Sequence, residues 1–410
     1  MMEPLLFLAH RLPYPPNKGD KVRSYHFLKH LAQRYRVFLG TFIDDPADGE
    51  HVPALRALCS ELHVEMLTPW RQRARSLGAL LSGEALSLPY FRSRRLAAWS
   101  ADIARRHQVR RAFVYSSAMA QYALGLPGVD SLVDFVDMDS AKWDDYAARR
   151  AWPASAVYGR ESRCLLAHER RVAAAARVSV FVTEEEAQRF RQSAPECVAN
   201  VTVIRNGVDA EYFSPSRALP CPFAPGERAI VFTGAMDYWP NVDAVVWFAR
   251  EVLPAIRREQ PSVRFHVVGM NPDASVRALT SDAGVTVTGR VPDVRPYLQH
   301  AAVVVAPLRV ARGIQNKVLE AMAMAKPVVA SAACASALSV RPGTDLAVAS
   351  DAPGFAAATL WAMQPPQARR LAEHARERIV RDYAWLHSLR QLEDLLGGVP
   401  LPAPRTAIAV

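Results

Sequence analysis

Residues 313–329 read Gly-Ile-Gln-Asn-Lys-Val-Leu-Glu-Ala-Met-Ala-Met-Ala-Lys-Pro-Val-Val. They follow the apolar run 302–307, which is typical of a buried parallel strand. A strand that ends near a glycine and opens a helix directs free backbone N–H groups and the positive end of the helix dipole outward, which favours a diphosphate. Lys317 in the first turn adds a positive charge, and Glu320 one turn later offers a carboxylate to two sugar hydroxyls. The stretch therefore predicts a site for a nucleotide sugar.

The rest of the chain alternates strand-like and helical patterns, which is typical of parallel sheets with crossover helices. The strands are expected in two successive series. The first series covers 5–9, 37–41, 62–67, 112–115, 131–136, 178–182 and 201–204, and the second covers 229–233, 264–268, 285–288, 302–306 and 328–330. Helical periodicity predicts helices over 21–34, 159–176, 241–259 and 294–300.

A proline-rich segment without periodic pattern, 214–226, separates the two series and is expected to be a linker. The sequence then divides into one doubly wound domain over 1–213 and a second over 227–383. Doubly wound sheets bind ligands outside the carboxyl ends of their strands, so two such domains are expected to face a cleft. The last residues, 397–410, carry few core candidates, and a disordered tail is expected there.

Composition excludes several classes of protein. At 410 residues, with half of them apolar, the chain is long enough for two domains with their own cores. No run reaches the roughly 18 apolar residues of a membrane-spanning helix, and the N-terminus leads into an apolar strand without a basic leader, so a cytoplasmic protein is expected. The five cysteines have neither metal-site nor disulfide spacing, and free thiols are expected.

The net charge of +10 is concentrated in one segment. Between Pro69 and Arg111, ten arginines face only Glu84 and Asp102, a local excess of +8, and leucines and aromatic residues are interleaved with them. This pattern predicts contact with an anionic membrane surface, or alternatively a solvated helix face over a core stripe. Because no nucleic-acid-binding module accompanies the charge, nucleic acid is not expected as a partner.

Two further loops of the second domain follow strands. Gly234 lies in the first strand-to-helix turn, where a glycine permits a ligand to approach, although a single glycine is also common in ordinary turns. Arg290 and Val291 follow the third strand, where their backbone groups suit a nucleotide base. The alternative is a simple turn before the helix 294–300.

In the first domain, the loop 13–23 follows the first strand. Gly19 permits close approach, Lys18 and Arg23 offer positive charge to a phosphate, and Asp20 lies between them, whereas a solvated basic loop is the competing interpretation.

Asp137 and Asp139 follow the fifth strand. A pair of aspartates holds a divalent metal in some sugar transferases, but those enzymes have a single nucleotide-binding sheet, so no metal is assigned. Asp137 remains a candidate for binding or deprotonating a substrate hydroxyl, and a helix N-cap formed by Asp139 or Ser140 is the alternative.

These motifs, in this order, resemble those of the retaining nucleotide-sugar glycosyltransferases of family 4. The resemblance covers roughly residues 5–396 and rests on 13–23, on Val203-Ile204-Arg205-Asn206-Gly207-Val208-Asp209, on Gly234, and on 319–323 with 327–329. The amino-acid sequence of 137–143 and 313–317 is similar to that of a bacterial subgroup associated with exosortase and exopolysaccharide loci.

The resemblance implies a GT-B fold of two Rossmann-like domains, an acceptor-side domain over 1–213 and a donor domain over 227–383. The resemblance further implies that a C-terminal helix, here 384–396, crosses back to the first domain. It also implies retention of configuration without a bound metal or other cofactor, and transfer from a UDP- or GDP-sugar to a polysaccharide or lipid-linked acceptor. By the same match, Glu320 would hold the ribose, Lys317 the diphosphate and Val291 the base, while the loop at Gly19 faces the transferred sugar. The remaining donor-binding candidates are Gly234, Arg290, Arg312, Gly313, Ile314 and Asn316, and the catalytic candidates are Asp137, Lys317 and Glu320.

The chain departs from the family pattern at two places. Arg312 stands where the family has a glutamate that contacts the donor sugar, and Ala235 and Asn241 stand near the usual Arg and Lys. Lys317 and Arg312 are candidates to supply the missing charge. A nucleotide-sugar 2-epimerase or hydrolase, using Asp137 and Asp20 as acid and base, and a catalytically silent binding subunit, which Arg312 favours, remain alternatives.

Overall fold

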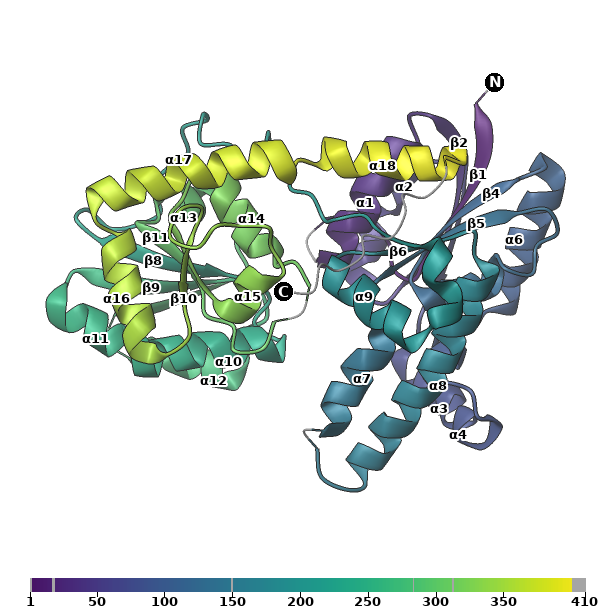
Figure 1. Cartoon of the computed structure of the whole chain (residues 1–410), viewed down its shortest axis with the longest axis horizontal. Helices are drawn as coiled ribbons and strands as arrows, with labels where there is room; N and C mark the ends of the chain where they lie inside the picture. Colours follow the sequence, from purple (N-terminus) through teal and green to yellow (C-terminus); the bar gives the residue numbers. More distant parts are fainter. Residues whose placement is uncertain (1, 17–18, 149, 283, 312, 400–410) are drawn as a thin grey trace. The chain divides into compact units, whose positions relative to one another are not determined.

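The computed structural model describes residues 2–16, 19–148, 150–282, 284–311 and 313–399 (Figure 1). The chain forms two compact units. Unit 1 comprises the residues up to Arg205 together with those from Leu389 onward, and unit 2 comprises Asn206–Ser388. The segment 214–226, expected to be a linker, belongs to unit 2.

Unit 1 contains a seven-stranded sheet in the order β3-β2-β1-β4-β5-β6-β7, in which every neighbouring pair is parallel. All seven strands predicted before residue 205 are present. The strands are β1 Glu3–Ala9, β2 Tyr35–Ile43, β3 Glu61–Met66, β4 Arg111–Tyr115, β5 Asp130–Val136, β6 Val178–Phe181 and β7 Val201–Val203.

Helices connect these strands and cover the sheet (Figure 1). The α-helices are α1 Gly19–Leu31, α2 Val52–Arg56, α3 Pro69–Leu77, α4 Ala79–Ser82, α5 Ser87–Tyr90, α6 Arg94–His107, α7 Asp139–Ala148, α8 Ala154–Ala175 and α9 Glu184–Ser193. Short 3-10 turns are η1 Pro46–His51, η2 Ser117–Tyr122 and η3 Pro195–Asn200. Helices α7 and α8 form a long hairpin that extends beyond the sheet.

Unit 2 repeats this architecture with six parallel strands in the order β10-β9-β8-β11-β12-β13. Five of them were predicted, and the short β13 was not. The strands are β8 Arg228–Thr233, β9 Val263–Val268, β10 Val285–Gly289, β11 Val303–Ala306, β12 Val328–Ser331 and β13 Ala347–Ala349. The helices are α10 Trp239–Trp247, η4 Phe248–Val252 (a π-helix), α11 Leu253–Glu259, α12 Ala274–Ala278, η5 Leu279–Ser281, α13 Arg295–His300, α14 Asn316–Ala323, α15 Ala332–Ser336, α16 Ala352–Ala362 and α17 Pro365–Asp382.

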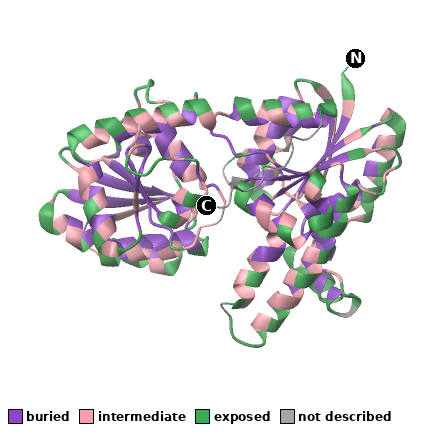
Figure 2. Cartoon of the chain, viewed as in Figure 1, coloured by how far each residue is buried: buried purple, intermediate pink, exposed green. Residues whose placement is uncertain are grey.

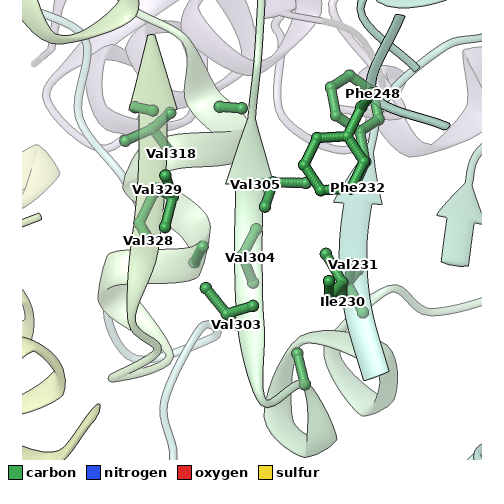
Figure 3. Close-up of a cluster of buried hydrophobic side chains, with 14 of the residues drawn as sticks. Ile230, Val231, Phe232, Phe248, Val303, Val304, Val305, Val318, Val328 and Val329 are labelled. Carbon is green, nitrogen blue, oxygen red and sulfur yellow. The ribbon is translucent and has the colours of Figure 1, made fainter. Parts of the chain in front are cut away.

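Burial on both faces explains why these strands are continuous apolar runs rather than alternating patterns. Figure 2 shows each sheet as buried and the outer helix faces as exposed. In Figure 3, valines of β11 and β12 pack beside Phe232 of β8, together with Phe248 and Val318. Val318 belongs to α14, so the core of unit 2 holds the helix that begins at Asn316 against the sheet.

The last helix, α18 Trp385–Gly397, begins in unit 2, and its residues from Leu389 onward belong to unit 1. Within unit 1, Gln391 donates to the Val203 carbonyl at 2.7 Å, and Glu393 contacts His30 at 3.3 Å and forms an ion pair with Arg34. The predicted return of the C-terminal helix to the first domain is therefore present.

Candidate active site

The strand order of unit 2 locates its switch point between β8 and β11. On one side of this point the chain continues from β8 to β9 and β10, and on the other from β11 to β12 and β13. Doubly wound sheets bind ligands in the crevice outside the carboxyl ends of the strands at such a point. Gly234 directly follows β8, and α14 is the next helix after β11, so the two motifs singled out in the sequence flank the switch point.

Lys317 is held between two of these elements. Its Nζ donates to Oδ1 of Asn241 in α10 at 2.5 Å and lies 4.3 Å from the centroid of the Phe232 ring. Asn241 is itself oriented, because its Nδ2 donates to the Ala235 carbonyl at 2.8 Å. Burial lowers the pKa of Lys317 to about 8, although negative charge on Cys334 or Glu320 acts in the opposite direction. The Lys317 ammonium is therefore held in one position and partly desolvated, which favours the binding of an anion.

Two glycines allow the loops after β8 and β9 to approach this lysine. A Cβ on Gly234 would lie 2.8 Å from Nδ2 of Asn241 and 3.2 Å from Nζ of Lys317. A Cβ on Gly269 would lie only 1.6 Å from the Gly234 carbonyl oxygen, so no side chain fits there without a backbone shift. A side chain at Gly234 would therefore crowd Asn241 and Lys317, and one at Gly269 would displace the backbone of Gly234.

Glu320 lies one turn after Lys317 on α14. Burial raises the pKa of Glu320 to about 7, while the neighbouring Lys317 lowers it. Burial also raises the pKa of Tyr212, with contributions from Asp293 and Glu320, so this phenol lies close to the carboxylate. The Arg295 guanidinium stacks 3.7 Å from the centroid of the Tyr212 ring and binds Asp293 at 2.7 Å. Burial thus favours the neutral form of Glu320, whereas the neighbouring Lys317 favours the charged form.

The start of α14 carries unsatisfied polar groups. The helix begins at Asn316, and the preceding Gln315 makes no side-chain cap to it. Among the described residues, the buried Oδ1 of Asn316 has no hydrogen-bond partner, and neither has the buried Oγ1 of Thr233, the last residue of β8. Buried polar atoms normally have partners, and each exception requires an explanation, such as a ligand. These two atoms leave hydrogen-bonding capacity at the switch point.

The other predicted donor-binding residues of unit 2 lie in loops at the same edge of the sheet. Gly313 adopts a positive φ of 61°, Ile314 is buried, and Val291 is half-buried. Arg290 is exposed, and its Nη2 lies 3.7 Å from Sδ of Met270 in the loop after β9. Arg312 and Lys18 lie outside the described residues.

In unit 1, Asp137 follows β5. Its Oδ2 lies 3.0 Å from Nζ of Lys142, which is also 3.0 Å from Asp139. Burial opposes the charge on Lys142, but the two carboxylates outweigh it and raise the pKa of Lys142 well above its usual value. Oδ1 of Asp137 is buried and has no partner among the described residues. Asp137 thus pairs with Lys142 through one oxygen and leaves the other as a possible acceptor for a hydroxyl group.

The N-terminus of α7 is capped from elsewhere in unit 1. The backbone N–H and hydroxyl of Ser140 both donate to Glu169 of α8, and the N–H of Met138 donates to Glu186 of α9 at 2.8 Å. Burial raises the pKa of Glu169 to about 8. The alternative in which Asp139 or Ser140 caps the helix with its own side chain is therefore not what the structure contains. Within the described ranges, no group of three or more His, Cys, Asp or Glu side chains is arranged to hold a metal.

Arg23 departs from its expected role. Gly19 and Asp20 open α1, and Arg23 in the same turn was expected to face a phosphate. Instead, its side chain is 1% exposed and binds Asp134 through Nε at 2.7 Å and Nη2 at 3.3 Å. Helical geometry turns Arg23 toward the sheet, where the buried carboxylate of β5 requires a counter-charge. The description of 13–23 as a loop that presents Arg23 to a ligand is corrected accordingly.

Sequence reasoning overlooked the part played by four residues. Asn241 was noted only as a departure, although it is the hydrogen-bond partner of Lys317. Gly269 and the stacked pair Tyr212 and Arg295 were not identified. The position of Gly269 directly after β9 could have identified it from the sequence. No local pattern, however, reveals which distant side chains contact Lys317 or Glu320.

Comparisons with known proteins show what the chain is similar to. Residues 227–364 match the family model described as "Glycosyl transferases group 1". A sequence comparison with curated proteins finds no significant match. None of the helices in the described ranges is long and apolar enough to span a bilayer.

Solved structures with a similar fold cover nearly the whole chain. Sucrose-phosphate synthase from Thermosynechococcus elongatus has a TM-score of 0.73 at 18% identity and covers 97% of this chain and 99% of its own. Anabaena HepE in complex with UDP has a TM-score of 0.68 at 14% identity, covering 97% and 100%. WaaG, a glycosyltransferase involved in lipopolysaccharide biosynthesis, has a TM-score of 0.66 at 16% identity, covering 96% and 100%. Residues 227–364 are therefore similar to group 1 glycosyltransferases, and the solved structures show that the chain has the GT-B fold.

Proposed function

We propose that this protein is a retaining, metal-independent hexosyltransferase that moves a sugar from a UDP- or GDP-sugar to a polysaccharide or lipid-linked acceptor in exopolysaccharide biosynthesis. The observation that carries the proposal is the environment of Lys317. Asn241 and Phe232 fix its ammonium beside Gly234, at the switch point of a sheet and near the open start of α14. A diphosphate would supply the negative charge and the acceptor oxygens that the Lys317 ammonium and the start of α14 require.

The chemistry that follows is electrostatic. As the bond between sugar and diphosphate breaks, negative charge develops on the leaving phosphate, and the Lys317 ammonium with the N–H groups of α14 stabilises it. The acceptor hydroxyl then forms the new bond to the anomeric carbon on the same face, and its proton passes to the leaving phosphate. The protein supplies no nucleophile in this scheme. Asp137, with one unpaired oxygen, is proposed to orient a substrate hydroxyl in unit 1.

The remaining residues are proposed to hold the donor. Glu320 accepts hydrogen bonds from the ribose hydroxyls, Val291 contacts the base through its backbone, and the loop at Gly19 faces the transferred sugar. A structure of HepE in complex with UDP-glucose lends support by analogy of fold. If the acceptor is a polymer or is lipid-linked, attachment of the enzyme to the inner face of the plasma membrane would bring it close to the acceptor. The basic segment 69–111 is proposed to provide this attachment.

Incubation of the purified protein with donor, with and without acceptor, tests this function. A donor is first selected by thermal shift with UDP, GDP and their sugars, because a ligand that binds the native state raises the unfolding temperature. Transfer requires acceptor-dependent release of nucleoside diphosphate. Conversion of the donor to a different nucleotide sugar without acceptor would identify an epimerase instead, and donor binding without any turnover would identify a silent binding subunit.

We expect the affinity for UDP to increase as the pH is raised from 6 to 7.5. The pKa of Glu320 is about 7, and only its ionised form accepts hydrogen bonds from both ribose hydroxyls. Glu320→Gln removes this charge and should weaken UDP binding by about 10-fold to 100-fold at pH 7.5. Calorimetric titration across this pH range checks both effects. An equal pH dependence in the Gln variant would assign the titration to the nucleotide's own phosphate and exclude Glu320 from ribose binding.

A further inference from the structure

Helix α3 exposes the face that a helix normally buries. Trp70, Ala74 and Leu77 recur at spacings of four and three residues and therefore share one side of the helix. All three are exposed, Trp70 by 67% and Leu77 by 63%, and of the nine residues of α3 only Ser76 is buried. The adjoining α4 adds Leu80, which is 41% exposed. The apolar stripe predicted in this segment thus points away from the core.

The arginines of the segment fall into two groups. Arg92, Arg105, Arg106 and Arg111 form ion pairs with Glu84, Asp102, Glu61 or Glu3, so they do not offer free charge. Arg71 and Arg73 in α3 are exposed, and no carboxylate of the described residues lies within ion-pair distance of them. Arg71 lies 5.2 Å from the Trp70 ring centroid. Arg75, Arg94, Arg95 and Arg110 are likewise exposed, without an ion-pair partner among the described residues. Three of these six unpaired arginines, Arg71, Arg73 and Arg75, lie in α3 beside the exposed apolar stripe.

The tip of the α7–α8 hairpin presents a second exposed anchor. Trp152, between the two helices, is 82% exposed. Side-chain bonds tie this hairpin to the α3–α4 region, because Arg160 donates to the Ala79 carbonyl at 2.5 Å and Glu161 accepts from the Leu86 N–H at 2.6 Å. Arg160 is about two helical turns from Trp152, or roughly 10 Å along α8. Figure 1 shows α3 and α4 beside α8 on the part of unit 1 that extends from the sheet.

We infer that Trp70, Arg71, Arg73, Leu77, Leu80 and Trp152 form one docking face for the surface of an anionic lipid bilayer. Tryptophan and leucine enter the boundary between headgroups and acyl chains, while arginine remains at the phosphates. The charge selects an anionic partner, and the outward apolar stripe favours a bilayer over a soluble polyanion, which would leave it in water. This inference deepens the membrane attachment proposed above, because it limits the contact to α3, α4 and the hairpin tip and leaves out most of segment 69–111.

Sedimentation of the full chain with vesicles tests the docking face. We expect binding to vesicles of phosphatidylcholine and phosphatidylglycerol but not to phosphatidylcholine alone, and loss of binding at high salt. Arg71→Ala/Arg73→Ala should weaken binding by roughly 25-fold, since each basic residue near an anionic surface contributes about fivefold. The matched control is Arg250→Ala/Arg258→Ala, two exposed arginines of unit 2, which should bind like wild type. Equal losses in the two variants would overturn the proposed location.

The apolar anchors are tested separately with brominated lipids, which quench tryptophan fluorescence on contact. Quenching in the wild type should be largely lost in Trp70→Phe/Trp152→Phe, and Leu77→Ala should weaken sedimentation, whereas Val380→Ala, at an exposed apolar site of unit 2, should not. Unchanged quenching in the double variant would refute the inference. Loss of oligonucleotide or heparin binding without loss of vesicle binding would show a soluble polyanion site instead.

These measurements use neither donor nor acceptor. A variant without transfer activity, such as Lys317→Met, should bind vesicles like wild type, so failure of the proposed function and failure of the docking face give different results.

Discussion

Lys317→Met should lower the rate of sugar transfer by about 10²–10³ while leaving the protein folded. Removal of one preorganised donor to the charge of a transition state has an effect of this size. The fold should tolerate the change because methionine replaces the long stem of a half-buried lysine, and the desolvation that lowers the pKa of Lys317 to about 8 is relieved. Initial rates at saturating acceptor, together with the thermal unfolding temperature, check the prediction.

Lys326→Met is the matched control. Burial also lowers the pKa of Lys326 to about 8, but its Nζ donates to the Gln299 carbonyl at 2.8 Å and takes no part in the site. We expect this variant to transfer sugar at nearly the wild-type rate. Near-normal turnover in Lys317→Met, or an equal loss in both variants, would refute the proposed role of Lys317.

The same lysine should produce proton uptake when UDP binds. Because the pKa of Lys317 is about 8 in the free protein, much of it is neutral at pH 8.5, and a bound diphosphate raises that pKa again. Calorimetry in buffers of different ionisation enthalpy measures the protons taken up. Uptake should be present in the wild type and in Lys326→Met, and absent in Lys317→Met. Uptake that persists in Lys317→Met would place the titrating group elsewhere.

Arg23→Met should destabilise unit 1 by about 3–5 kcal/mol, because it leaves the carboxylate of Asp134 buried without its counter-charge. Burial already raises the pKa of Asp134 even with Arg23 present, and Arg23 opposes that rise. In the variant the pKa should rise further above the unfolded value, so the folded state binds more protons than the unfolded state over that interval. Stability is then lost as the pH rises, and the variant should be less unstable at pH 5 than at pH 8. Denaturant unfolding at both pH values measures this difference.

Two comparisons make the Arg23 prediction specific. Arg23→Met/Asp134→Leu removes both charges and should recover most of the lost stability. Arg309→Met breaks the exposed ion pair with Asp243 in unit 2 and should cost less than about 1 kcal/mol. An Arg23→Met variant of normal stability but weakened nucleotide binding would instead restore the phosphate-binding role that the sequence suggested.

The sequence alone was sufficient to predict the two-sheet fold. Strands buried on both faces are continuous runs of apolar residues, so the runs 5–9 and 302–306 were recognisable without tertiary information. Strand β13 was not predicted because its three residues, Ala-Val-Ala, are too few to show a strand pattern. Gly313, Lys317 and Glu320 could be proposed as site residues from the sequence because a loop and the helix that follows it are adjacent in the chain, and so are the charged residues that they carry.

Contacts between distant residues were decided only by the tertiary structure. Lys317 and Asn241 are separated by 76 positions and Arg23 and Asp134 by 111, and no periodicity links such partners. Arg23 is an example. A lysine or arginine near a ligand loop suggests a phosphate site, but the orientation of α1 directs the Arg23 side chain into the core, where it pairs with the buried carboxylate of Asp134 on β5. Likewise, the apolar residues of α3 were expected either to bury a stripe or to contact a membrane, and only the packed helix shows that the stripe is exposed. Local patterns specify strands, helices and their turns because those depend on neighbouring residues, whereas the direction in which a side chain points depends on how the elements pack.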